Sequence, residues 1–168
     1  MTQVKLERKL RFLIRTLPVV FLLHNVEEVI TMEQWSDVTS RFITDPASTE
    51  QFAIAVGIFS VLGFIVVFGR KLYKSERTYD YVITGFSGML LLNVFIPHLI
   101  GAIYLGTYTP GLITGVLLNL PLSLSILKLL EQLQRLTIKQ IILSVITGGV
   151  TGAILAYLLL ETGKVLIP

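Results

Sequence analysis

The sequence predicts an all-α membrane protein, a polytopic bundle of about five transmembrane helices. Hydrophobic residues make up 53% of the 168 residues and charged residues only 15%, which is far more apolar than a soluble domain of this length. The apolar residues also fall into runs close to the roughly 20 residues that a helix needs to cross a bilayer. We therefore expect residues 1–168 to form a single transmembrane helical domain.

The first predicted span begins with two arginines, Arg11 and Arg15, and has few small residues near its end. We interpret it as a retained helix, because a cleaved signal peptide is shorter and ends in small residues. The predicted spans cover residues 11–32, 51–69, 81–105, 110–130 and 138–160.

Two of the later spans carry local signals of their own. The third contains Pro97, which cannot donate the hydrogen bond that the carbonyl of Asn93 would accept, so a kink is expected near Asn93. The fourth begins with Thr109, Pro110 and Gly111, where threonine suits a helix N-cap and proline suits the first helical position. We expect this helix to start at Thr109.

Positively charged residues set the predicted orientation, because Lys and Arg near span ends stay on the cytoplasmic side. An inside N-terminus leaves only Arg41 and Lys164 outside, and five spans then place the C-terminus outside. We expect a multi-pass protein of the plasma (inner) membrane. The longest outer connection, residues 33–50, is either a lid or a linker.

Composition also restricts the chemistry and the partners. The chain has no cysteine, which excludes disulfides, thiolate metal sites and iron–sulfur clusters. Its net charge of +3 comes from basic residues beside apolar runs, so no nucleic acid is expected and membrane lipid is the expected partner. Glycines four residues apart, Gly111 with Gly115 and Gly148 with Gly152, predict close helix packing within the chain or in a homodimer.

Ionisable side chains inside the spans point to a site, because such groups are costly in lipid unless they are paired or hydrated. His24, Glu27 and Glu28 share one face near the end of the first span. At about 1.5 Å per residue, Glu28 lies roughly 24 Å and His98 roughly 26 Å from the inner ends of their spans. These groups are therefore predicted to meet in the outer half of the membrane.

Two imidazoles and a carboxylate form a common set of protein ligands for zinc or non-haem iron. We predict that His24, Glu28 and His98 bind a divalent metal ion, zinc in preference to iron. Glu27 would be the catalytic base, by analogy with H-x-x-E-H metalloproteases, in which the first and fifth residues bind zinc and the fourth is the base. Asn93 would orient a ligand or hold a substrate oxygen.

The start of the fourth span completes the predicted site. Its positive helix end would face the metal and hold an anionic group of the substrate, such as a phosphate or a carboxylate. The predicted substrate-binding residues are Asn93, Thr109, Pro110, Gly111 and Thr114.

The same residues allow other interpretations. They could be interfacial carboxylates with a hydrogen bond between helices, a bis-histidine haem site, or part of a proton or ion pathway. Internal repeats of the kind found in transporters are not visible in the sequence, which disfavours transport.

The segment His24-Asn25-Val26-Glu27-Glu28 near the end of a hydrophobic span is followed by Asn93, His98 and the Pro110-Gly111 pair. This order resembles the HXXEE-domain family of small bacterial integral membrane proteins, over most of the chain. The resemblance implies the same site residues. It implies no reaction, since the family is named after its motif.

The sequence thus leads to one functional hypothesis and two alternatives. The hypothesis is a metal-dependent membrane hydrolase that acts on a lipid or another amphiphilic substrate. The first alternative is a non-haem iron membrane oxidase. The second is a non-catalytic protein, either a proton-coupled or metal-ion carrier or an accessory membrane subunit.

Overall fold

The computed structural model describes residues 2–39 and 47–167, and every regular element in these two ranges is helical. The all-α prediction is therefore confirmed for this part of the chain. Residues 40–46 of the predicted lid or linker lie outside the described residues. The elements in chain order are α1 (Gln3–Thr39), α2 (Thr49–Phe68), η1 (Arg70–Leu72), α3 (Glu76–Asn93), η2 (Val94–Leu99), α4 (Ile100–Leu105), α5 (Leu112–Thr114), η3 (Gly115–Asn119), α6 (Leu120–Gln132) and α7 (Ile138–Leu166).

Four segments of the described chain are long and apolar enough to cross a membrane, and they confirm a membrane protein with transmembrane helices. Helix α1, which contains the predicted span 11–32, is not among them. The number of spans and the orientation therefore stay predictions. The four segments are Thr49–Phe68, Glu76–Leu105, Leu112–Gln132 and Ile138–Leu166.

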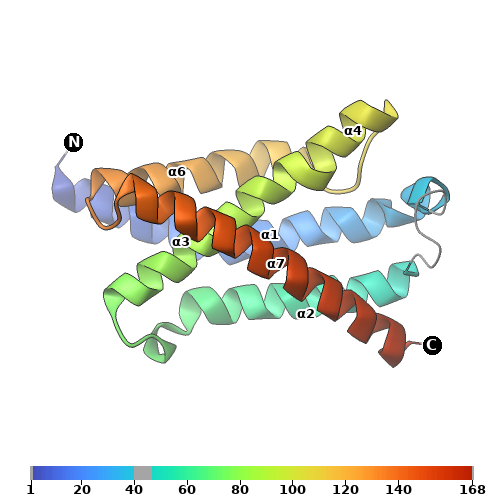
Figure 1. The fold of residues 1–168 in the computed structure, drawn as a ribbon, viewed down its shortest axis with the longest axis horizontal. Helices are drawn as coiled ribbons and strands as arrows, with labels where there is room; N and C mark the ends of the chain where they lie inside the picture. The colour runs from blue at the N-terminus through green and yellow to red at the C-terminus, as the bar shows by residue number, and fades with distance from the viewer. Residues whose placement is uncertain (1, 40–46, 168) are drawn as a thin grey trace.

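The helices lie along one long axis, with α1 reaching nearly from end to end of the molecule and α7 crossing α3 (Figure 1). The N-terminus, the α2–α3 connection and the α6–α7 connection share one end of the bundle, which we call the N-terminal end (Figure 1). The C-terminus and the α4–α5 connection lie at the opposite end. Hydroxyl caps at Ser48, Ser75 and Thr137 begin α2, α3 and α7, because each accepts a hydrogen bond from an otherwise unpaired backbone N–H.

Polar side chains are buried in this bundle while apolar ones face outwards. His24, Asn119 and Thr84 are fully buried, whereas Ile142 and Val150 on α7 are more than half exposed. Lipid readily solvates such an apolar surface, and polar groups within a membrane-spanning bundle normally face its interior. The distribution supports membrane insertion independently of helix length.

Helices α3 and α7 approach each other through small residues. A Cβ atom on Gly148 would overlap the backbone of Gly85, and one on Gly152 would overlap the side chain of Met89. The glycines at 148 and 152 therefore serve close packing within the chain, as one of the two interpretations predicts. A homodimer through Gly111 and Gly115 or through this pair stays a prediction.

An arginine between α6 and α7, Arg135, links helices α1 and α3 at the N-terminal end of the bundle. The Nη1 atom of Arg135 donates to Oδ1 of Asp80 on α3, and its Nη2 atom donates to Oε2 of Glu7 on α1, both at 2.8 Å. Asp80 is only 4% exposed, so its charge depends on this partner. The sequence alone did not indicate this cluster.

Two of the four apolar segments, Glu76–Leu105 and Leu112–Gln132, are interrupted by irregular helix. The expected kink near Asn93 is confirmed: α3 ends there and the π-helical η2 follows, with Ile96 at a non-helical φ of −130° and ψ of 115°. Pro97 lacks the N–H needed to continue an α-helix. The predicted helix start at Thr109 is wrong, because Gly111 occupies the N-cap of α5 and the Thr109 hydroxyl donates to the carbonyl of His98 instead.

Candidate metal centre

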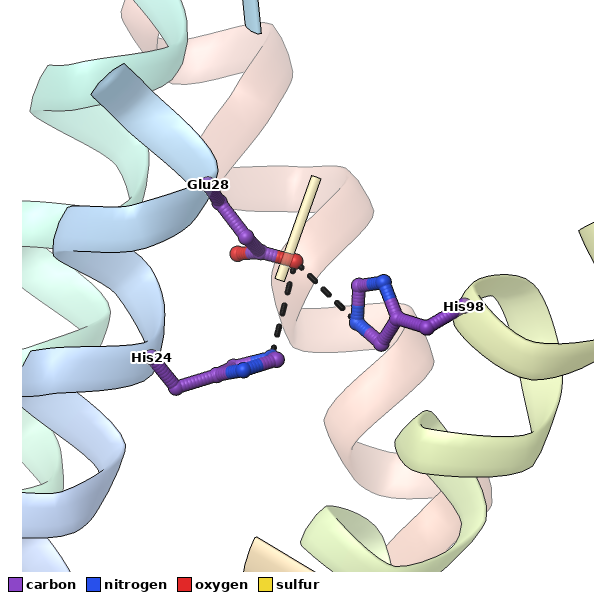
Figure 2. Close-up of side chains that lie close together, drawn as sticks. All are labelled: His24, Glu28 and His98. Carbon is purple, nitrogen blue, oxygen red and sulfur yellow. Dashed lines mark ion pairs between the residues drawn. The ribbon is translucent and has the colours of Figure 1, made fainter. Parts of the chain in front are cut away.

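Two helical segments bring three possible metal ligands to one point. Helix α1 contributes His24 and Glu28, which lie one turn apart on the same face, and η2 contributes His98 (Figure 2). Oε1 of Glu28 lies 3.6 Å from Nε2 of His24 and 3.3 Å from Nε2 of His98. The predicted meeting of these three side chains is therefore present in the structure.

The spacing of these atoms suits a single metal ion. All three candidate ligand atoms lie within 4.8 Å of one another. Zinc binds imidazole nitrogen and carboxylate oxygen at about 2.0–2.1 Å in a tetrahedral arrangement, which separates neighbouring ligand atoms by about 3.3 Å. The two distances to Glu28 come close to that value, so only small side-chain shifts would be needed to bind an ion.

Asn93 at the end of α3 lies beside both imidazoles. Its Nδ2 atom is 3.0 Å from Nε2 of His24 and 2.9 Å from Nε2 of His98. An amide NH₂ group can donate two hydrogen bonds, and with this amide orientation both Nε2 atoms accept, so each ring carries its proton on Nδ1. A metal ion would need these same two lone pairs, so the Asn93 amide and an ion are alternative partners of the two Nε2 atoms.

Thr114 holds the first of these rings from its other side. Its Oγ1 atom lies 2.9 Å from Nδ1 of His24. Such bonds to the second ring nitrogen fix the orientation of metal-binding histidines. The end of α5 thus supports the His24 imidazole.

The centre is enclosed. His24 is 0% exposed, His98 is 3% exposed and the Glu28 side chain is 14% exposed. Gly111 closes one side: a Cβ atom there would lie 2.7 Å from Cε1 of His24 and 2.9 Å from both Cγ of Glu28 and Cε1 of His98. Only a glycine fits this space, and its φ of +79° also favours glycine.

Glu27 turns away from the three ligand atoms and caps the following helix. Its oxygens accept hydrogen bonds from the backbone N–H groups of Ile113 at 3.0 Å and Thr114 at 2.7 Å, and from the Tyr108 hydroxyl. Burial and this last bond raise the pKa of Tyr108 to about 12, so the phenol stays a donor at neutral pH. A carboxylate at a helix N-terminus is stabilised by the helix dipole.

This position of Glu27 bears on two predicted roles. The helix end expected to hold an anionic substrate group already holds the Glu27 carboxylate. The base role of Glu27 and the substrate-binding role of residues 109–111 and 114 are not tested by these contacts and stay predictions. Sequence reasoning did not identify the contact with Tyr108.

The fold and the site define a helical membrane protein with a buried His/Glu cluster that could hold a metal ion. The model of one family, described as "Protein of unknown function with HXXEE motif", matches residues 16–126. The chain therefore belongs to the HXXEE family, as its motif suggested. The matched region contains His24, Glu28, Asn93, His98 and Gly111, and it ends before α7.

A relative supports this assignment without adding an activity. The chain is 30% identical over 146 residues to "Uncharacterized protein YrkK" of Bacillus subtilis (strain 168), which covers 87% of this chain and 92% of that protein. No solved structure matches the chain.

Proposed function

We propose that this chain is a metal-dependent membrane enzyme that binds one divalent ion, zinc in preference to iron, through His24, Glu28 and His98. Its reaction would be the hydrolysis of a lipid or another amphiphilic substrate. Its location would be the plasma (inner) membrane, with the centre in the outer half of the bilayer. The observation that carries the proposal is the convergence of two Nε2 atoms and Oε1 of Glu28 in a buried space.

His24, Glu28 and His98 would hold the ion, which would supply the Lewis acidity that activates water for hydrolysis near neutral pH. Lipid chains could reach such a centre sideways through the bundle, which is why an amphiphilic substrate is favoured over a soluble one. The apolar outer surface of the helices would be in contact with lipid.

Two roles for Glu27 remain to be separated by experiment. As the base, it would take a proton from the bound water. As a positioning residue, it holds the backbone of Thr114, whose hydroxyl contacts the His24 ring. The three hydrogen bonds to its oxygens favour the positioning role, because a carboxylate that accepts several hydrogen bonds is a weaker base.

Elemental analysis of the detergent-purified protein tests the proposal. We expect about one zinc or iron per chain, strongly reduced in His24→Ala, His98→Ala and Glu28→Gln. Glu27→Gln is the matched control, because it makes the same carboxylate-to-amide change at the neighbouring residue and should retain the metal. Each variant is checked for helicity and for thermal unfolding.

The outcomes separate the hypotheses. Metal in the wild type that is lost only from the three ligand variants supports the metal centre, and its identity decides between hydrolysis and an iron-dependent oxidation. If metal-replete wild type contains none, the proposal fails. If Glu27→Gln loses the ion as completely as Glu28→Gln, Glu27 is itself a ligand and the assignment is wrong.

One observation favours a second candidate, a non-catalytic accessory subunit. The Asn93 amide can satisfy both imidazoles without any metal, so the cluster can act as a hydrogen-bonded clasp between α1 and α3. In that case metal-replete protein would contain no ion and Asn93→Ala would lower the unfolding temperature. If the chain is instead the proposed metal-dependent enzyme, removal of the metal by EDTA would lower the unfolding temperature.

A further inference from the structure

A cavity of about 310 Å³ lies at the N-terminal end of the bundle, away from the metal centre. Four arginines line it: Arg11 and Arg15 on α1, Arg70 on η1, and Arg135 between α6 and α7. No residue of the His/Glu cluster lines this cavity. The arrangement thus forms a basic cavity that the proposed enzyme reaction does not use.

Two of the four arginines already have acidic partners. Arg70 pairs with Glu76, and Arg135 pairs with Glu7 and Asp80. The Arg70 guanidinium also lies 4.2 Å from the centre of the Tyr79 ring. These contacts fix the positions of the Arg70 and Arg135 side chains. Their positive charges are largely balanced by the paired carboxylates, so they are less available to a ligand.

Arg11 and Arg15 differ from the other two. Both are exposed, and neither has an acidic partner within residues 2–39 and 47–167. They lie one turn apart on α1, so their guanidinium groups can act on the same ligand. The cavity therefore carries two positive charges that no described side chain neutralises.

Apart from Glu76, which pairs with Arg70, and Tyr79, the rest of the cavity wall is apolar. Leu10 and Ile14 contribute from α1, and Val67 and Phe68 from the end of α2. Phe68 is 57% exposed, at the end of a helix that is apolar enough to lie in lipid. A ligand that fits would thus combine an anionic group with a hydrocarbon part.

We propose that this cavity binds the phosphate group of an anionic phospholipid, with Arg11 and Arg15 as its main contacts. Guanidinium groups suit phosphate because they can donate two parallel hydrogen bonds. Basic pockets between transmembrane helices on the cytoplasmic side bind lipid headgroups, and the distribution of Lys and Arg predicts that this end is cytoplasmic. The proposal does not depend on the metal centre.

Lipid binding to the full chain in a neutral detergent tests the inference, with native mass spectrometry as the readout. The protein is titrated with phosphatidylglycerol and, separately, with phosphatidylcholine. We expect preferential binding of phosphatidylglycerol, with an affinity about 30-fold lower in the double variant Arg11→Gln/Arg15→Gln. The double variant Arg11→Lys/Arg15→Lys should keep part of that affinity.

A matched control separates a built site from general attraction to basic residues. Lys5→Gln/Lys9→Gln removes two charges with the same spacing from the same helix, and neither lysine lines the cavity. This variant should bind phosphatidylglycerol like the wild type. Equal losses in the two glutamine double variants, or no loss in either, would overturn the proposal.

Competition with glycerol phosphate shows whether the bound phosphate group belongs to a lipid or to a small molecule in solution. If it displaces phosphatidylglycerol only at concentrations far above that of the lipid, the lipid is the ligand, as proposed. If it binds as tightly as the lipid, the phosphate comes from solution and the lipid assignment is wrong. Thermal unfolding of each variant without lipid confirms that a loss of binding is not a loss of fold.

Discussion

Replacing Gly111 with alanine is the most direct test of the enclosed geometry of the centre. The new methyl group would lie 2.7 Å from a carbon of the His24 ring and 2.9 Å from carbons of Glu28 and His98. Carbon atoms in ordinary contact are about 3.5–4.0 Å apart. The substitution therefore pushes against all three proposed ligands at once.

The structure also allows the size of the effect to be worked out. Gly111 has a φ of +79°, and a non-glycine residue in the left-handed region costs about 1–2 kcal/mol. Crowding in a packed interior adds about 1–3 kcal/mol. Gly111→Ala should therefore lower the free energy of unfolding by about 2–5 kcal/mol.

Gly106 provides the matched control. Its φ is +63°, but nothing lies within 4 Å of a Cβ atom built there. Gly106→Ala should show only the conformational cost of about 1–2 kcal/mol, and the change in unfolded-state entropy is the same for both substitutions. The difference between the two variants measures the crowding alone.

The assay is reversible unfolding in mixed detergent micelles, followed by circular dichroism, with metal content measured in parallel. Gly111→Ala should be the less stable variant and should bind metal more weakly, whereas Gly106→Ala should keep the metal. Equal stability losses in the two variants, with metal retained in both, would refute the enclosed geometry described for the cluster.

Three further predictions concern the remaining structure. Arg135→Met leaves the buried carboxylate of Asp80 without a partner and should cost about 3 kcal/mol in the same unfolding assay; a loss under about 1 kcal/mol would show that the ion pair contributes little. Gly148→Ala should destabilise the bundle by about 2 kcal/mol because the methyl group overlaps the α3 backbone. Its control is Gly57→Ala, in which the methyl group meets nothing within 4 Å, so this variant should be neutral or stabilising. A larger loss of stability in Gly57→Ala than in Gly148→Ala would contradict the packing of α7. Thr114→Val removes the hydrogen bond to the histidine on α1 and should weaken metal binding by about 10–100-fold without unfolding the protein, and an unchanged affinity in metal titrations would exclude that supporting role.

The sequence was sufficient to predict those features that depend on local spacing and on depth in the membrane. His24 and Glu28 are four residues apart on one helix, so their proximity follows from helix geometry. His98 was placed beside them because its distance from the end of its own span was similar. The membrane character follows from apolar runs that need no tertiary information.

The features that the sequence did not reveal depend on how distant segments pack. Arg135 pairs with Asp80 and Glu7, which are 55 and 128 residues away along the chain, and no local pattern identifies such partners. The helix start at Thr109 looked regular, but the chain uses Gly111 because the two imidazoles and Glu28 leave no room for a side chain there. Tertiary crowding overrode the local capping signal.

The polarity of α1 has a consequence for how the protein enters the membrane. This helix carries His24, Asn25, Glu27 and Glu28 in its second half and is not among the four segments apolar enough to insert by composition. A charged residue raises the free energy of inserting a lone helix, by at most about 2.5–3.5 kcal/mol when it lies at the helix centre. Asn25 gains a partner in Ser60 on α2, 35 residues later. His24 and Glu27 reach Asn93 at the end of α3 and Thr114 in α5 only about 70–90 residues later in synthesis. As a predicted span, α1 would therefore insert stably only together with the later helices, and the centre would form in the same step.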